Sequence, residues 1–242
     1  MAPRFYAPDT EFRVGERAFL TEKARHHAGR VLRLVAGDVA VLFDGKGRCA
    51  SGPIAFEGKD GFITVESIDS PATETPVRIT LLQSLVSPEK MDWIVEKAVE
   101  TGVSVIAVVP ARRSITKLTE ERLQKRMAHW KDIAVSACEQ CGRNAVPEIR
   151  FYKKLEQAFD EIGAQRRFIL SPGSDAKAKL SDCTSVAFAI GPEGGFDADE
   201  IASAVERDWQ CVLIGPRVLR TETAGIVAAT LANVASGDYL VD

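Results

Sequence analysis

Apolar and polar positions change their rhythm along the chain and divide it into two parts. Over about the first 70 residues, short apolar segments alternate with turn signals. The apolar run Val39–Phe43 is closed by a turn at Asp44–Gly47, and Phe62–Ile68 alternates with a period close to two. Gly52-Pro53 and Gly58–Gly61 indicate further turns. Strands spaced this closely predict a small β-barrel.

One helical insert is predicted within this part, over Thr21–Leu32, with Thr21 as its N-cap. On such a helix His26, Arg30 and Arg33 share one face. His27 borders that face, and two adjacent histidines point in different directions, which argues against a shared metal ion. Histidine and arginine together suit contacts with phosphates and bases. A solvated surface helix remains the alternative.

The stretch Ser70–Pro76, with two prolines and three Ser/Thr residues, predicts a linker. Beyond it, strand-like and helix-like segments alternate, which predicts an α/β layer with a mainly parallel sheet. Ser87 is the expected N-cap of the first of these helices, and Pro88 its first residue. Strands are expected at 77–86, 103–109, 168–171, 186–190 and 211–214, and helices at 88–100, 119–141, 197–207 and 223–235.

Length and composition narrow the class of protein. The chain has 242 residues, enough for one to two domains, with 45% hydrophobic and 27% charged residues. Its longest unbroken apolar runs, such as Val105–Val109, are far shorter than the roughly 20 residues of a membrane-spanning helix. The first residues show no export signal, and five irregularly spaced cysteines argue against a disulfide framework. These features predict a cytoplasmic protein.

Charge is distributed unevenly. The net charge is -3, which argues weakly against a nucleic-acid partner. Residues 1–33 nevertheless carry seven Lys/Arg against four Asp/Glu, and residues 112–131 carry seven against two. A local basic face is what a phosphate backbone recognises. A solvated helix face explains the second stretch equally well.

Two glycine-bearing loops follow predicted buried strands. The first, Gly191–Phe196, comes directly after Ile190 and precedes a helix. Ligands of open α/β sheets bind beyond the carboxyl ends of the strands, and glycines let the backbone approach them closely. The spacing matches neither the dinucleotide fingerprint nor the P-loop. For this loop alone, an ordinary strand-to-helix turn remains the simpler alternative.

The second glycine loop follows the strand that ends at Ile214. Thr221 or Thr223 is expected to cap the next helix. Capping does not explain two arginines, Arg217 and Arg220, beside the end of a buried strand, where an unpaired charge is costly. This loop therefore favours a functional site.

The segment Glu139–Arg143 ends the long basic helix, with Gly142 as the expected C-cap. Cys138 and Cys141 form a C-x-x-C pair. No second ligand pair lies near it for zinc, and a redox pair belongs at the start of a helix. No metal is expected. Arg143 is instead placed to reach RNA or a partner subunit.

Together these motifs resemble the RsmE family of 16S ribosomal RNA (uracil-N3)-methyltransferases, in the SPOUT superfamily. The match covers nearly the full chain in order and spacing, and includes Arg4–Tyr6, His26–Arg33, Lys90–Lys97 and Glu139–Arg143. The resemblance implies an α/β fold with a PUA-like RNA-binding β-barrel over 1–72 and a SPOUT domain with a trefoil knot over 73–242. It also implies S-adenosylmethionine as cofactor, 16S ribosomal RNA of the small ribosomal subunit as partner, and a homodimer.

The same resemblance directs attention to particular residues. Backbone groups of tight loops are suited to read an adenine, and residues at strand ends supply apolar walls. The expected cofactor-binding residues are Leu170, Ile190, Gly191, Glu193, Gly194, Ile214, Gly215, Val218, Leu219 and Arg220. The expected RNA-binding residues are Arg4, His26, His27, Arg30, Arg33, Arg112 and Arg113.

Methylation at N3 requires a uracil that is unpaired and loses its N3 proton. A guanidinium near the uracil carbonyls stabilises the developing anion, and the expected residue is Arg220, with Arg143 second. Arginine stays protonated, so the base is Glu222, Glu193 or water, and the sequence does not decide among them. Two other functions compete. A non-catalytic RNA-binding module leaves both glycine loops unexplained, and a nucleotide-dependent oxidoreductase or phosphotransferase lacks the usual phosphate-binding spacing.

Overall fold

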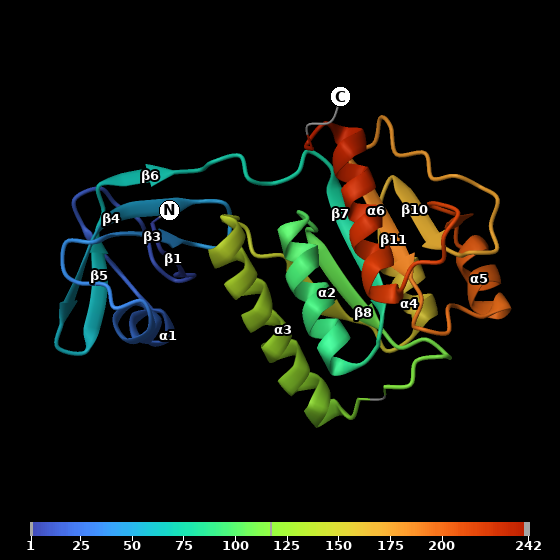
Figure 1. Cartoon of the computed structure of the whole chain (residues 1–242), viewed down its shortest axis with the longest axis horizontal. Coiled ribbons are helices and arrows are strands. Elements are labelled where there is room, and N and C mark those ends of the chain that lie inside the picture. Colours follow the sequence, from blue (N-terminus) through green and yellow to red (C-terminus); the bar gives the residue numbers. More distant parts are fainter. Residues whose placement is uncertain (1, 117, 240–242) are drawn as a thin grey trace. The chain divides into compact units, whose positions relative to one another are not determined.

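The computed structural model describes residues 2–116 and 118–239, and the chain divides into two compact units (Figure 1). The first unit consists of Met1–Glu74 together with Val135–Val146. The second consists of Thr75–Ala134 and Pro147–Asp242. Within the described part, no helix is long and apolar enough to cross a membrane.

The first unit is built on six short strands around an apolar core. Strand β1 pairs with β3 in parallel, β3–β4–β5–β2 pair antiparallel, and β6 also pairs with β4. The strands are β1 (Arg4–Tyr6), β2 (Arg17–Phe19), β3 (Val39–Phe43), β4 (Cys49–Glu57), β5 (Asp60–Thr64) and β6 (Ser67–Asp69). The predicted strand Val39–Phe43 is confirmed. So is the turn after it, in which the Asp44 carboxylate accepts the backbone N–H of Lys46 at 2.7 Å.

Two local predictions in this unit are wrong. Gly52-Pro53 does not form a turn but lies inside β4, and the strand predicted over Phe62–Ile68 is divided into β5 and β6. Both strands pair with β4, but their register shifts by one residue: Ile54 lies opposite Ile63, and Ser51 opposite Ser67. The extra residue forms a bulge opposite Gly52.

The predicted insert is helical, but only its first half is α-helix. Thr21 caps α1 (Glu22–His26) through a hydrogen bond from Ala24 N–H, and a π-helix follows over His27–Val31. The wider π-turn ends the helix before Arg33, which adopts a left-handed conformation with φ of 56°. The prediction that Arg33 shares a helical face with His26 and Arg30 is therefore wrong.

The second unit contains a six-stranded parallel sheet in the order β12-β10-β11-β7-β8-β9, which confirms the predicted α/β layer. Its strands are β7 (Arg78–Ser84), β8 (Val105–Val109), β9 (Glu148–Phe151), β10 (Arg166–Leu170), β11 (Ser185–Ile190) and β12 (Gln210–Val212). Its helices are α2 (Pro88–Glu100), α4 (Leu155–Glu161), α5 (Ala198–Val205) and α6 (Thr221–Ser236). The long helix α3 (Glu120–Cys141) contributes residues to both units.

Helix boundaries follow local signals in this unit. Pro88 is the first residue of α2 after Ser87, as predicted, although the Ser87 hydroxyl makes no capping bond. Gly142 ends α3 with φ of 90°, and its N–H bonds to the Cys138 carbonyl. The short elements β9 and α4 were not predicted. All five cysteines are free thiols.

The bulge predicts a strict requirement for glycine at position 52. A Cβ added there would lie 1.8 Å from the Thr64 carbonyl oxygen, so the two strands must separate. We expect Gly52→Ala to lower the free energy of unfolding by about 2 kcal/mol, measured by urea denaturation. Gly163→Ala is the control, because a Cβ there meets no atom within 4 Å. Equal stability of the two variants contradicts the prediction.

Candidate functional site

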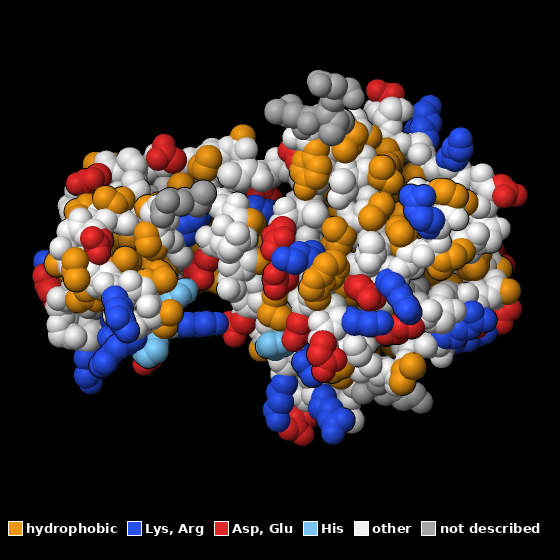
Figure 2. All heavy atoms as spheres, in the orientation of Figure 1, with side chains coloured by type: hydrophobic (Ala, Val, Ile, Leu, Met, Phe, Trp, Pro, Cys, Tyr) orange, Lys and Arg blue, Asp and Glu red, His pale blue; other side chains and the backbone are white. Residues whose placement is uncertain are grey.

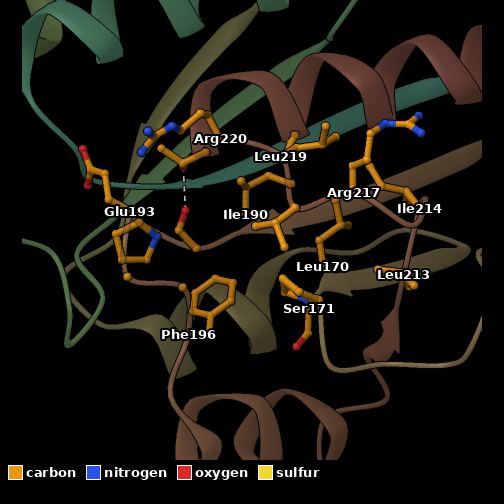
Figure 3. A pocket seen from close by; sticks show the side chains of 18 of the residues that line it. Leu170, Ser171, Ile190, Glu193, Phe196, Leu213, Ile214, Arg217, Leu219 and Arg220 are labelled. Atoms are coloured by element: carbon orange, nitrogen blue, oxygen red, sulfur yellow. Dashed lines mark hydrogen bonds between the residues drawn. The ribbon is translucent and has the colours of Figure 1, made fainter.

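A pocket of about 610 Å³ lies beyond the carboxyl ends of β10, β11 and β12 in the second unit (Figure 3). Parallel strands end at the same edge of a sheet, so loops far apart in the chain meet there. The pocket is lined by residues of the segments 170–172, 190–196, 212–215 and 217–221, together with Arg113 and Ala224. Its volume is typical of small-molecule sites.

Glycines give the first loop its compact shape. A Cβ on Gly191 would lie 2.8 Å from the Phe196 nitrogen, so the loop folds back on its own start. Gly195 has a φ of 67°, and its N–H closes a turn to the Pro192 carbonyl at 2.8 Å. Gly194 packs against the side chain of Arg113. The loop is therefore more constrained than an ordinary strand-to-helix turn requires.

A threonine of the second loop links it to the first. The Thr221 hydroxyl donates to the Gly191 carbonyl oxygen at 2.6 Å and accepts from Gln83 Nε2 at 2.9 Å. The predicted capping role is wrong: Arg220 is the N-cap of α6, without a side-chain capping bond, and Thr221 is its first residue. Gln83 was not singled out from the sequence. The available signal was one amide directly after the apolar pair Leu81-Leu82 near the end of β7.

All ten expected cofactor-binding residues line this one pocket. Arg220 and Glu193 lie toward the same end, whereas Arg217 and Ile214 lie toward the other (Figure 3). The side chains of Arg217 and Arg220 are exposed, and neither forms an ion pair with a carboxylate of residues 2–116 or 118–239. The pocket therefore has two cationic groups available to a ligand.

One lysine holds the two candidate bases. Lys90 Nζ donates to Glu193 Oε1 at 3.0 Å and lies 3.6 Å from Glu222 Oε2. The hydrogen bond to Glu193 raises the pKa of the Lys90 ammonium. Burial acts to raise the pKa of the Glu193 carboxyl, but the backbone N–H of Glu193 and the Lys90 ammonium outweigh it and lower that pKa. Glu193 is thus an anion at neutral pH.

Other expected site residues belong to the first unit. Arg143 is buried and pairs with Glu74, so it lines no part of the pocket. Arg4 donates a hydrogen bond to the Asn144 side chain. The rings of His27 and Phe5 are in edge-to-face contact, with their centroids 6.0 Å apart. The exposed members of the set are His26, Arg30 and Arg33.

Two residues of the second unit that are expected to bind RNA already bond to other residues of this chain. Arg112 Nη1 bonds to Asp197 at 2.9 Å and to Asp199 at 2.7 Å. The hydrogen bonds with these two carboxylates raise the pKa of the Arg112 guanidinium. Arg113 Nη1 donates to the Gly194 carbonyl at 2.7 Å. Arg112 is therefore largely neutralised, and Arg113 helps to shape the pocket wall.

The pocket offers a ligand both hydrogen-bonding groups and apolar surface. It offers backbone groups of two tight loops, apolar strand ends and open space beside Gly215, where an added Cβ meets no atom within 4 Å. Among the described residues, no group of three His, Cys, Asp or Glu side chains is placed to hold a metal ion.

Residues 73–233 match the family described as the RNA methyltransferase domain, and residues 20–66 match the RNA methyltransferase PUA domain. A ribosomal RNA small subunit methyltransferase E from Neisseria gonorrhoeae, solved bound to S-adenosyl methionine, is 33% identical. That comparison covers 99% of this chain and 100% of the other, with a TM-score of 0.91.

Two proteins with the same name extend the likeness. The one from Buchnera aphidicola is 28% identical, over 98% of this chain and 95% of its own length. The one from Bacillus subtilis is 28% identical, over 86% of each chain. The chain belongs to the RNA methyltransferase family and, within it, to the group of ribosomal RNA small subunit methyltransferase E.

Proposed function

We propose that this protein transfers a methyl group from S-adenosylmethionine to N3 of a uridine in 16S ribosomal RNA of the small subunit. One observation carries the proposal. The two glycine loops, linked by Thr221, enclose a pocket at the strand ends. A relative matched over the full chain was solved with S-adenosyl methionine bound.

The pocket fits this cofactor. Adenine is neutral, and loop amides and carbonyls around Gly191 and Gly215 suit its hydrogen-bonding edge. Leu170, Ile190 and Ile214 form apolar walls. When bound, the cofactor supplies an electrophilic methyl group. The protein must hold that carbon in line with N3, and such positioning contributes roughly 7–11 kcal/mol to lowering the barrier.

Arg220 is the proposed stabiliser of the uracil anion. It is exposed at the mouth of the pocket, and no described carboxylate neutralises its charge. Arg143 stays the second candidate, although it must first leave Glu74. Of the two candidate bases, Glu193 lies nearer to the Lys90 ammonium, at 3.0 Å, and Glu222 lies at 3.6 Å. Glu222 Oε2 is buried without a hydrogen bond from a described residue, so Glu222 is the proposed acceptor of the N3 proton.

The remaining assignments concern domains and partners. We propose a division into 1–72 and 73–242, with the first domain holding RNA, a trefoil knot in the second, and a cytoplasmic location. The expected RNA contacts are kept, with Arg30, Arg33 and His26 as the most accessible. Trp93 of α2 and Leu231 of α6 are 42% and 37% exposed on neighbouring helices, and this apolar face supports a homodimer.

The function is tested by incubating the protein with S-adenosylmethionine that carries a labelled methyl group and with small ribosomal subunits. The subunits are taken from cells that lack this protein. Label in 16S ribosomal RNA, found by mass spectrometry as N3-methyluridine, is the expected result. RNA binding without methyl transfer would instead support a non-catalytic RNA-binding module.

Replacing Arg220 tests the catalytic assignment. We expect Arg220→Ala to lower kcat by about 100-fold or more, because the uracil anion loses its guanidinium. Calorimetry should still detect S-adenosylmethionine binding. Arg217→Ala is the matched control: it removes an equally exposed arginine from the other end of the pocket and should change kcat less than tenfold. Near-normal turnover by Arg220→Ala removes this residue from the mechanism.

Replacing Thr221 tests the link between the loops. Thr221→Val keeps the shape of the side chain but deprives both Gln83 and Gly191 of a hydrogen-bond partner. Leaving a buried polar group without a hydrogen bond costs about 1–3 kcal/mol of free energy for each group. We expect the Kd for S-adenosylmethionine, measured by calorimetry, to rise at least tenfold. Thr223→Val, two residues later on α6, should leave the Kd within twofold. Equal affinities of the two variants refute the proposed link.

A further inference from the structure

A second cavity of about 450 Å³ lies in the second unit, between the end of β7, α2 and the first part of α3. Its floor is apolar and includes Val86, Pro88, Met91 and Trp130. Trp130 is 1% exposed, and its indole N–H has no acceptor among the described residues. An apolar lining that includes an aromatic side chain suits a nucleobase.

The rim of this groove is basic. Arg122, Lys125, Arg126 and His129 line it from successive turns of α3. Figure 2 shows Lys and Arg side chains gathered over the lower, N-terminal end of this helix. Side chains at these spacings lie along one face of a helix. The groove therefore combines three cationic side chains, Arg122, Lys125 and Arg126, with an apolar floor.

Carboxylates offset only part of this charge. Lys125 pairs with Glu121 at 2.8 Å, and the His129 ring meets Asp92 at 2.8 Å. Within residues 2–116 and 118–239, neither Arg122 nor Arg126 forms an ion pair with a carboxylate. Arg126 is moreover only partly exposed. A partly buried guanidinium without a counterion favours an anionic ligand.

The groove and the cofactor pocket are lined by residues that are neighbours along the chain. Pro88 and Met91 line the groove, while Lys90, between them in the first turn of α2, donates to Glu193 of the pocket. Arg113 likewise lines the pocket, and Thr116, three residues later, lines the groove. The two cavities therefore adjoin the same turn of α2 and the same loop after β8.

We propose that this groove binds a nucleotide of the substrate RNA adjacent to the methylated uridine. Its phosphates contact Arg122 and Arg126, and its base packs on the apolar floor. The identity of the RNA rests on the proposed function, but the binding of a single-stranded RNA at this surface does not. Neutralising these arginines should weaken RNA binding and leave the cofactor pocket intact.

The test uses the full chain and a fluorescein-labelled single-stranded RNA of about 12 nucleotides, with binding followed by anisotropy. We expect R122Q/R126Q to raise the Kd at least tenfold. The slope of log K against log salt should fall in magnitude by about 1.4, for two lost phosphate contacts. The control K131Q/K179Q removes two positive charges from exposed positions outside the groove, and its Kd should change less than threefold.

Further readouts separate this proposal from the proposed function. Calorimetry with S-adenosylmethionine should give the same Kd for R122Q/R126Q and the wild type. If R122Q/R126Q binds RNA as well as the control does, the groove proposal is overturned, whether or not the wild type transfers a methyl group. If R122Q/R126Q changes the molar mass in light scattering as it loses RNA, the groove is a contact between copies and the proposal also fails. If the wild type binds RNA at the groove but transfers no methyl group, the groove proposal is supported and the proposed methyltransferase function is refuted.

Discussion

The arrangement of the cofactor pocket depends on one hydroxyl group. Thr221, the first residue of α6, joins the Gly191 carbonyl after β11 to the Gln83 amide at the end of β7. It thereby connects two strand ends that are far apart in the chain. Gln83 is fully buried, so its amide N–H groups must find acceptors inside the protein, and these are the Ser84 carbonyl and the Thr221 hydroxyl. Because the glycine loop is tightly folded, fixing one of its carbonyls fixes the groups on either side of it.

Around this link, the neighbours of each charged group decide what the group can do. Arg112 is held by two aspartates and Arg143 by Glu74, so each of these guanidiniums already has a carboxylate partner. Arg220 has no such partner among residues 2–116 and 118–239, and it lines the pocket. Lys90 keeps Glu193 ionised and holds Glu222 more loosely. Residues of the same type therefore differ in how far their charge is offset, according to their distance from an opposite charge.

The first turn of α2 contacts both the pocket and the groove. Its lysine contacts the pocket wall, while its proline and methionine form part of the groove beside α3. A single turn thus contributes to both surfaces. In the proposed complex, a nucleotide bound in the groove restrains the base next to it. In this arrangement binding energy from a neighbouring nucleotide contributes to the alignment of the reacting atoms.

Sequence alone determined the features that depend on neighbouring residues. The buried run Val105–Val109, the start of α2 at Pro88 and the glycine loop after Ile190 follow from periodicity and backbone preferences that act over a few positions. All ten expected cofactor-binding residues came to one pocket because parallel strands end at a common edge.

Only the tertiary structure decided features that depend on distant partners. Gly52 lies within a strand because Thr64 packs against it, and Thr221 bonds to residues 30 and 138 positions away instead of capping its helix. Arg112 finds its carboxylates 85 and 87 residues along the chain. Hydrogen bonds and ion pairs act over a few ångströms in space, and separation along the sequence does not specify those distances.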